Sequence, residues 1–169
     1  MDLKEALTVA IDYEHRVRDH YARGTEALLD PKAKKVFETL AREEQGHITY
    51  LESRLAEWQK RGYVDSPELP TILPSVAWVQ TARDRLADLP AGTTTGNEMD
   101  LLKTALELER ATSGFYRSLV DTLPAGQREL FARFLAIEEG HLAIVQAEID
   151  AVAGHGHWFD FQEFSLEAG

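Results

Sequence analysis

The apolar residues of this chain recur every three or four positions along four long segments, the spacing that places side chains on one face of an α-helix. We therefore expect helices at about 2–29, 31–61, 97–122 and 125–153. Asp30-Pro31 separates the first two segments and Leu123-Pro124 the last two. Proline is tolerated in the first turn of a helix but not in its interior, so each pair of helices is predicted to be joined by a tight turn.

The connection between the second and third helices, about 62–97, is long and contains four prolines. A short helix is expected within it, at about 75–87. Tight turns make antiparallel hairpins, whereas a long connection crosses from one hairpin to the other. The pattern thus predicts an all-α four-helix bundle in a single domain, 1–169, with the bundle at about 2–153. Gly154 is expected to end the last helix, and 154–169 forms an aromatic tail.

The second half of the chain repeats the polar positions of the first half at a nearly constant offset. The matched pairs are Glu14 and Glu109, Tyr21 and Tyr116, Glu44 and Glu138, and His47 and His141. The glycines match as well, because Gly46 precedes the first histidine and Gly140 the second. The chain is therefore interpreted as two copies of one helical hairpin.

The spacing within each copy predicts that these polar side chains meet. Glu44 and His47 are three residues apart and share a helix face. Glu14 lies about as far before the turn at Asp30 as Glu44 and His47 lie after it, so the three reach the same height in an antiparallel hairpin. The second hairpin has the same arrangement. Joining the hairpins through their apolar faces would bring four glutamates and two histidines together in the centre of the bundle.

Four carboxylates in a dry interior repel one another, so such a cluster must take up protons or bind cations. Two divalent ions balance four carboxylates. A ligand set of oxygens and two imidazoles suits iron or manganese with open coordination positions, although the order of affinities does not exclude zinc. The chain has no cysteine, which excludes disulfides, thiolate metal sites and a cysteine nucleophile.

These motifs resemble those of the ferritin-like superfamily of di-iron carboxylate proteins, and most of all its rubrerythrin branch. The resemblance covers about 2–153 and is carried by EHRVRDHY (14–21), EQGH (44–47), ERATSGFY (109–116) and EEGH (138–141). It implies a ferritin-like bundle that holds two iron ions. The implied roles are bridging ligands for Glu44 and Glu138, terminal carboxylates for Glu14 and Glu109, one metal each for His47 and His141, and hydrogen bonds to the ligand carboxylates for Tyr21 and Tyr116.

The resemblance implies an oxidoreductase that reduces hydrogen peroxide or O2, or oxidises ferrous iron, at the four-glutamate, two-histidine site. Two departures from the family bear on this expectation. No cysteine-ligated rubredoxin domain is present in the sequence, so the electron donor is expected to be external. Thr112 stands where many rubrerythrins carry an additional glutamate that exchanges with a ligand. The alternatives are a metal-handling protein without turnover and a metal-free structural bundle.

Charge and hydropathy limit the partners. The formal net charge of −11 makes nucleic acid a poor partner. No apolar run approaches the roughly 20 residues that span a bilayer, and charges at the start of the chain argue against a signal peptide. A cytoplasmic protein is therefore expected, and the resemblance and the aromatic tail favour a homodimer.

Two further pairs of residues, beside or within the motifs, also lead to expectations. Glu43 and Glu139, the neighbours of the proposed bridging glutamates, are expected to face water or form salt bridges. Gly46 and Gly140 lie inside helices, where glycine costs about 1 kcal/mol relative to alanine. A close approach of another helix is the hypothesis for both glycines.

Overall fold

The computed structural model describes residues 1–71, 73, 77–81 and 96–158, and within these ranges all regular structure is helical. Four long helices account for most of it: α1 (Leu3–Ala27), α2 (Pro31–Arg61), α4 (Gly96–Thr122) and α5 (Ala125–His155). Each predicted helix is confirmed, and each end lies within two residues of its expected position. A helical turn also occurs at 77–81; the rest of the short helix expected in the connection lies outside the described residues.

The helix ends have the local chemistry that the sequence requires. Asp2 and Glu5 form a capping box at the start of α1, in which each side chain accepts a hydrogen bond from the other residue's backbone N–H, at 2.8 and 3.0 Å. Asp30 caps α2 by accepting from two backbone N–H groups, and Pro31 occupies the first position of that helix. The tight turn between α1 and α2 therefore follows from Asp30-Pro31.

The glycine expected to end the last helix was wrong by two residues. α5 continues through Gly154 to His155, and Gly156 ends it with a φ of 67°. Gly62 ends α2 in the same left-handed conformation, with a φ of 72°. Two glycines stand near the end of α5, and sequence alone does not show which of them leaves the right-handed conformation.

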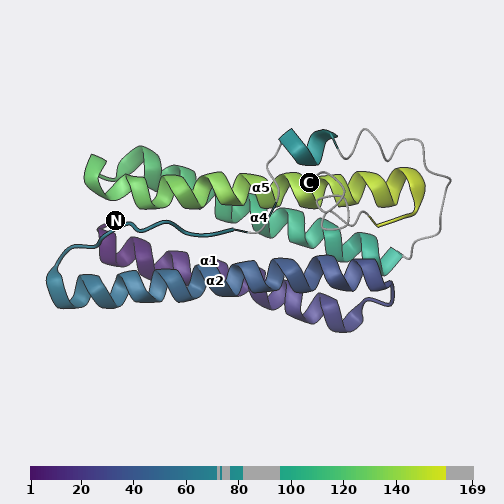
Figure 1. Cartoon of the computed structure of the whole chain (residues 1–169), viewed down its shortest axis with the longest axis horizontal. Helices are drawn as coiled ribbons and strands as arrows, with labels where there is room; N and C mark the ends of the chain where they lie inside the picture. The colour runs from purple at the N-terminus through teal and green to yellow at the C-terminus, as the bar shows by residue number, and fades with distance from the viewer. Residues whose placement is uncertain (72, 74–76, 82–95, 159–169) are drawn as a thin grey trace.

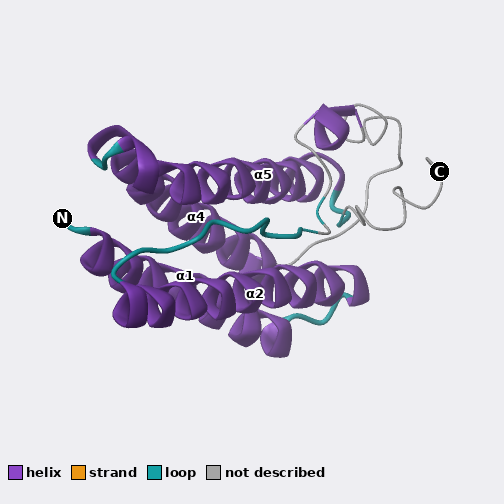
Figure 2. Ribbon diagram, turned by 60° about the vertical axis from the view of Figure 1, so that its left-hand side comes forward, coloured by secondary structure: helices purple, strands orange, loops and turns teal. Residues whose placement is uncertain are grey.

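The helices are arranged as two hairpins, α1 with α2 and α4 with α5, which contact each other through α1 and α4 (Figure 1). The partners within each hairpin run antiparallel, and α4 runs opposite to α1 (Figures 1 and 2). The apolar core has two clusters. One packs around Phe37, near the turn between α1 and α2, and the other around Phe131, near the turn between α4 and α5. The polar motifs lie between these clusters, in the middle of all four helices.

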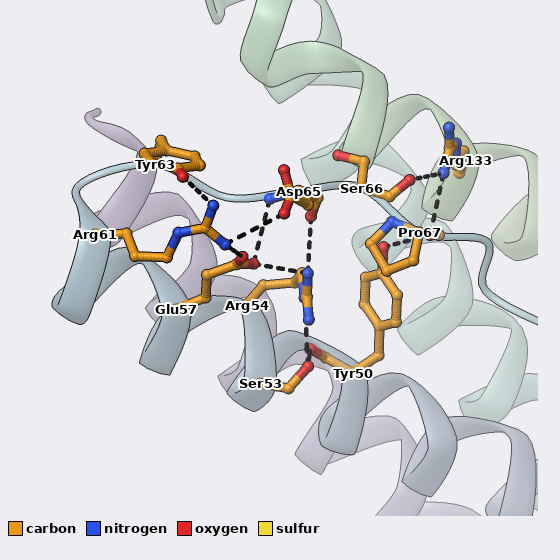
Figure 3. A network of polar contacts seen from close by, with 10 residues as sticks. All are labelled: Tyr50, Ser53, Arg54, Glu57, Arg61, Tyr63, Asp65, Ser66, Pro67 and Arg133. Carbon is orange, nitrogen blue, oxygen red and sulfur yellow. Dashed lines mark hydrogen bonds and ion pairs between the residues drawn. The ribbon is translucent and has the colours of Figure 1, made fainter.

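After α2, the connection returns along the molecule between α2 and α5 and is fixed to both helices (Figures 2 and 3). The Tyr50 hydroxyl donates to the carbonyl of Pro67 at 2.7 Å, and Arg133 of α5 donates to the same carbonyl at 3.0 Å and to that of Ser66. Arg54 of α2 donates to the carbonyl of Asp65 at 3.0 Å. Side chains of α2 and α5 therefore satisfy backbone carbonyls that regular structure leaves unpaired.

The start of the tail packs on the bundle, as expected for an aromatic segment. Trp158 is buried and meets the Phe37 ring edge-on, with ring centroids 5.9 Å apart. The remaining aromatic residues of the tail lie outside the described residues. Among the helices of the described ranges, none is both long and apolar enough to cross a membrane.

Candidate metal centre

Every one of the four long helices contributes an acidic side chain to the middle of the molecule. The six polar residues there are at most 1% exposed: Glu14 on α1, Glu44 and His47 on α2, Glu109 on α4, and Glu138 and His141 on α5. The structure thus brings together all six residues that the sequence singled out as candidate ligands. Their burial is unusual, because charged residues are almost never fully buried without a partner.

These six residues form two overlapping groups. In one group, donor atoms of Glu14, Glu44, His47 and Glu138 all lie within 4.8 Å of one another. The other group, with the same limit, contains Glu44, Glu109, Glu138 and His141. Glu44 and Glu138 belong to both groups, whereas each of the other four residues belongs to only one. A divalent ion lies about 2.0–2.2 Å from its nitrogen and oxygen donors, so donors on opposite sides of it are separated by about 4.4 Å at most. Each group is thus close to the size of one coordination sphere.

The Nδ1 atoms of both imidazoles face the carboxylates. Nδ1 of His47 lies 3.0 Å from Glu44, 3.2 Å from Glu14 and 3.3 Å from Glu138. Nδ1 of His141 lies 2.7 Å from Glu44 and 3.7 Å from Glu109. The two rings are stacked, with centroids 5.4 Å apart and planes 9° from parallel. Each ring therefore presents the same nitrogen to the cluster.

Within the described part of the chain, several of these buried polar atoms have no hydrogen bond, which is rare in folded proteins. They include both carboxylate oxygens of Glu44 and of Glu138, one oxygen of Glu109, and Nδ1 of His141. The 2.7 Å separation between His141 and Glu44 is short enough for a hydrogen bond, but the angles are unsuitable. Lone pairs that crowd together without hydrogen bonds fit a site built to hold cations, and the donor set of oxygens and imidazole nitrogens suits divalent transition metals.

The pKa values of the buried glutamates also indicate a cluster that needs positive charge. Burial, followed by repulsion from Glu44, raises the pKa of Glu14 to about 8. The same two causes raise the pKa of Glu138 well above its usual value. Protons therefore neutralise part of the cluster when no cation does so.

The histidines and Glu44 stabilise one another as charged groups. Burial lowers the pKa of His47, but the neighbouring carboxylates, Glu44 above all, raise it well above its usual value. The pKa of His141 is raised for the same reason. Burial acts to raise the pKa of Glu44, yet the imidazoles of His141 and His47 outweigh it and hold that pKa well below its usual value.

The two tyrosines hydrogen-bond to glutamates across the interface between the hairpins. The Tyr21 hydroxyl on α1 donates to Glu109 on α4, and the Tyr116 hydroxyl on α4 donates to Glu14 on α1. The sequence predicted that both tyrosines bond to carboxylates of the cluster, and the observed contacts agree. Each tyrosine, however, serves the opposite hairpin from its own. Both tyrosines are fully buried, so water does not compete with these hydrogen bonds to the carboxylates.

Thr112 is buried beside the cluster but offers no carboxylate. Its hydroxyl donates to the carbonyl of Leu108, one turn earlier in α4, at 2.9 Å. Two further buried acids, Glu98 and Glu148, belong to neither four-residue group and were missed by the sequence analysis. Of the two, Glu148 could have been predicted to be buried, because it follows His141 by two helical turns and so lies on the same face of the helix.

The expectations for the residues beside the motifs had mixed outcomes. Glu139 is exposed and pairs with Arg117 at 2.7 Å, as expected. Glu43 is only half-buried but lies closer to the centre than expected, because its carboxylate is within 4.8 Å of a nitrogen of His47 and of His141. The hypothesis for Gly46 and Gly140 was wrong: a Cβ added to either glycine would meet no atom within 4 Å. Among the described helices, none presses against these positions.

Comparison with known proteins gave no match: no family model matches the sequence, and neither a curated protein nor a solved structure matches it significantly. The functional argument therefore rests on the residues of the centre.

Proposed function

We propose that this chain is a ferritin-like, dinuclear metal protein whose centre holds two iron ions. The observation that carries the proposal is the pair of overlapping four-residue groups that share Glu44 and Glu138. Shared carboxylates are what two adjacent ions require, because each carboxylate has two oxygens and can bind one ion with each. Glu14 and His47 would complete one ion's ligands, and Glu109 and His141 the other's.

The proposed reaction is the reduction of hydrogen peroxide or O2, or the oxidation of ferrous iron, as in rubrerythrin-like proteins. When bound, two ferrous ions would supply the two electrons that, with two protons, are needed to reduce one hydrogen peroxide molecule to two molecules of water. The chain's own contribution is to hold the ligands and exclude water. The tyrosine hydroxyls keep one oxygen of Glu14 and one of Glu109 oriented. The other oxygen of Glu109 has no hydrogen-bond partner among the described residues, and the other oxygen of Glu14 pairs with Nδ1 of His47 at 3.2 Å, a contact that an ion bound to both would replace. With two imidazoles and four carboxylates for two ions, coordination positions remain open for a substrate.

The test begins with metal content. Protein stripped of metal and loaded anaerobically with Fe2+ should bind two ions per chain. Glu44→Ala should lose dinuclear binding because it removes a ligand from both groups. Glu139→Ala is the matched control, since this neighbour of Glu138 is exposed on the far side of α5 and pairs with Arg117. Circular dichroism of each variant would verify that it is folded.

Turnover is then measured on the loaded protein. Consumption of hydrogen peroxide or O2 in proportion to bound iron would support the oxidoreductase. Two bound ions without consumption would favour a metal-handling protein instead. Less than one metal ion per wild-type chain would refute both and leave a structural bundle.

A further inference from the structure

A row of aromatic rings leads from the candidate centre toward the surface of α2. The Phe134 ring of α5 is fully buried and meets the imidazole of His47 edge-on, with centroids 5.4 Å apart and planes at 80°. The same ring packs on Tyr50 of α2, with centroids 5.7 Å apart and planes at 61°. Tyr50 is half-buried, and its hydroxyl donates to the carbonyl of Pro67 in the connection (Figure 3). Both separations are those of packed aromatic pairs, so three rings in contact connect a candidate ligand with the surface.

Phe134 borders one of the two four-residue groups. Besides contacting His47, it stacks on Tyr116, with centroids 5.2 Å apart and planes at 25°. The Tyr116 hydroxyl in turn donates to Glu14. Glu14 and His47 are the two residues that belong to the first group and not to the second. The row of rings therefore leads to the metal position that Glu14 and His47 would complete.

The other copy of the repeat has aliphatic residues at the corresponding positions. By the offset between the two copies, Tyr50 corresponds to Ile144 and Phe134 corresponds to Leu40. Ile144 and Leu40 are both fully buried. The core of this bundle can therefore be packed with aliphatic side chains at these positions, and packing alone does not explain the two rings beside His47.

We propose that Tyr50 and Phe134 form the route by which electrons enter the centre from an external one-electron donor. The inference rests on the proposed function, because a centre that reduces hydrogen peroxide or O2 must be reduced again after each reaction. Each transfer oxidises the donor by one electron and converts one ferric ion into a ferrous ion, so two transfers restore the centre. No bond forms or breaks at the rings. They serve as the packed medium between the donor and the imidazole of His47, because electron transfer weakens steeply with distance and with gaps in packing.

The experiment measures single electron transfers in the full chain, in the absence of hydrogen peroxide and O2. The chain has no cysteine, so one introduced cysteine carries a ruthenium polypyridyl photoreductant at a defined place. Ser53→Cys places the label on the exposed side of α2, one helical turn after Tyr50. Glu139→Cys places it on the exposed side of α5 that faces Arg117 of α4. A flash starts the transfer, and the loss of ferric absorption gives its rate.

Three substitutions are compared at each label position. Phe134→Leu introduces the aliphatic residue that the first copy of the repeat has at this position. Phe131→Leu is the matched control, because Phe131 is equally buried in the same apolar cluster and stacks on Tyr116, but has no ring contact with His47 among the described residues. Tyr50→Leu removes the outer ring. Circular dichroism, iron content and the midpoint potential of the centre are measured for each variant.

From the label at position 53, Phe134→Leu and Tyr50→Leu should each slow the transfer several-fold, and Phe131→Leu should leave its rate unchanged. From the label at position 139, all three variants should keep the wild-type rate. If Phe134→Leu loses iron, the same two rates in Tyr50→Leu decide the question, because Tyr50 contacts none of the six candidate ligands among the described interactions.

Wild-type rates from position 53 in the variants that lack a ring would refute the route. Equal slowing from both labels would also overturn it, because that result would show a changed potential of the centre instead of a broken path. Fewer than two iron ions per wild-type chain, or a ferric centre that accepts no electron from either label, would refute the proposed function and the route with it.

Discussion

Two glycines inside the long helices should respond to alanine with opposite signs. At Gly46, an added Cβ meets nothing within 4 Å, so alanine should contribute its full advantage in a helix, about 1 kcal/mol. At Gly24, the same Cβ would lie 2.5 Å from two ring carbons of Phe37. That ring has little room to move, because Tyr21 and Trp158 pack against it with centroid distances of 5.2 and 5.9 Å.

The magnitudes follow from these distances. Forcing a methyl group into a packed core costs about 1–3 kcal/mol, and two contacts at 2.5 Å place Gly24→Ala at the upper end. After the helix advantage of about 1 kcal/mol is subtracted, Gly24→Ala should destabilise the protein by about 2 kcal/mol. Gly46→Ala should stabilise it by about 1 kcal/mol and raise Tm by about 2–4 °C, the usual response of a chain of this length.

Urea denaturation followed by far-ultraviolet circular dichroism measures both free energies of unfolding. The protein should be stripped of metal and kept with a chelator, because bound metal would add its own stabilisation. Destabilisation by Gly46→Ala would refute the reasoning, because it would show that the added methyl group meets an obstacle on this face of α2. Wild-type stability in Gly24→Ala would contradict the close packing of Phe37 on α1.

Three further predictions concern the centre and its cover. Burial and repulsion by Glu44 raise the pKa of Glu14 to about 8, so binding of a divalent ion must displace a proton below that pH. That single proton should make the apparent affinity rise by up to about tenfold per pH unit between about pH 6 and 7.5, and calorimetric titrations that show a flat profile would contradict this. Tyr21→Phe removes the hydroxyl that orients Glu109 and should weaken metal binding about 10–100-fold in a chelator competition, whereas unchanged affinity would show that the bond is dispensable. Arg133→Ala removes the hydrogen bonds from α5 to the carbonyls of residues 66 and 67 and should speed proteolytic cleavage of this segment. An unchanged cleavage rate would show that the bonds from α2, such as that of Tyr50 to Pro67, are sufficient to hold it.

The sequence was sufficient to predict which residues meet, because helical periodicity and the repeat act together. Glu44 and His47 must share a face of α2, and the turn at Asp30 sets the height at which Glu14 meets them. In the second hairpin, the same spacing brings Glu109 to the height of Glu138 and His141. These rules depend only on distances along the chain, which the sequence states directly.

What the sequence did not predict depends on how the helices are rotated against one another. Tyr21 bonds to Glu109 of the other hairpin, and that choice of partner follows from the packing of α1 on α4. The same limit explains the error at Gly46 and the omission of Gly24, since periodicity identifies a glycine but not what faces it. Glu43 lies near His47 of its own helix and near His141 of α5, and no spacing within one helix reveals the second contact.

The supply of ligands by all four helices has a consequence for the lifetime of the protein. An ion that binds only the folded chain stabilises it by about 2.7 kcal/mol when its free concentration is 100 times Kd, so the two proposed ions would contribute about 5 kcal/mol. The whole free energy of unfolding of a typical domain is only about 5–15 kcal/mol. A chain made under metal starvation would therefore open far more often and be degraded sooner than a loaded one. Abundance of the protein would follow metal supply without any change in its synthesis.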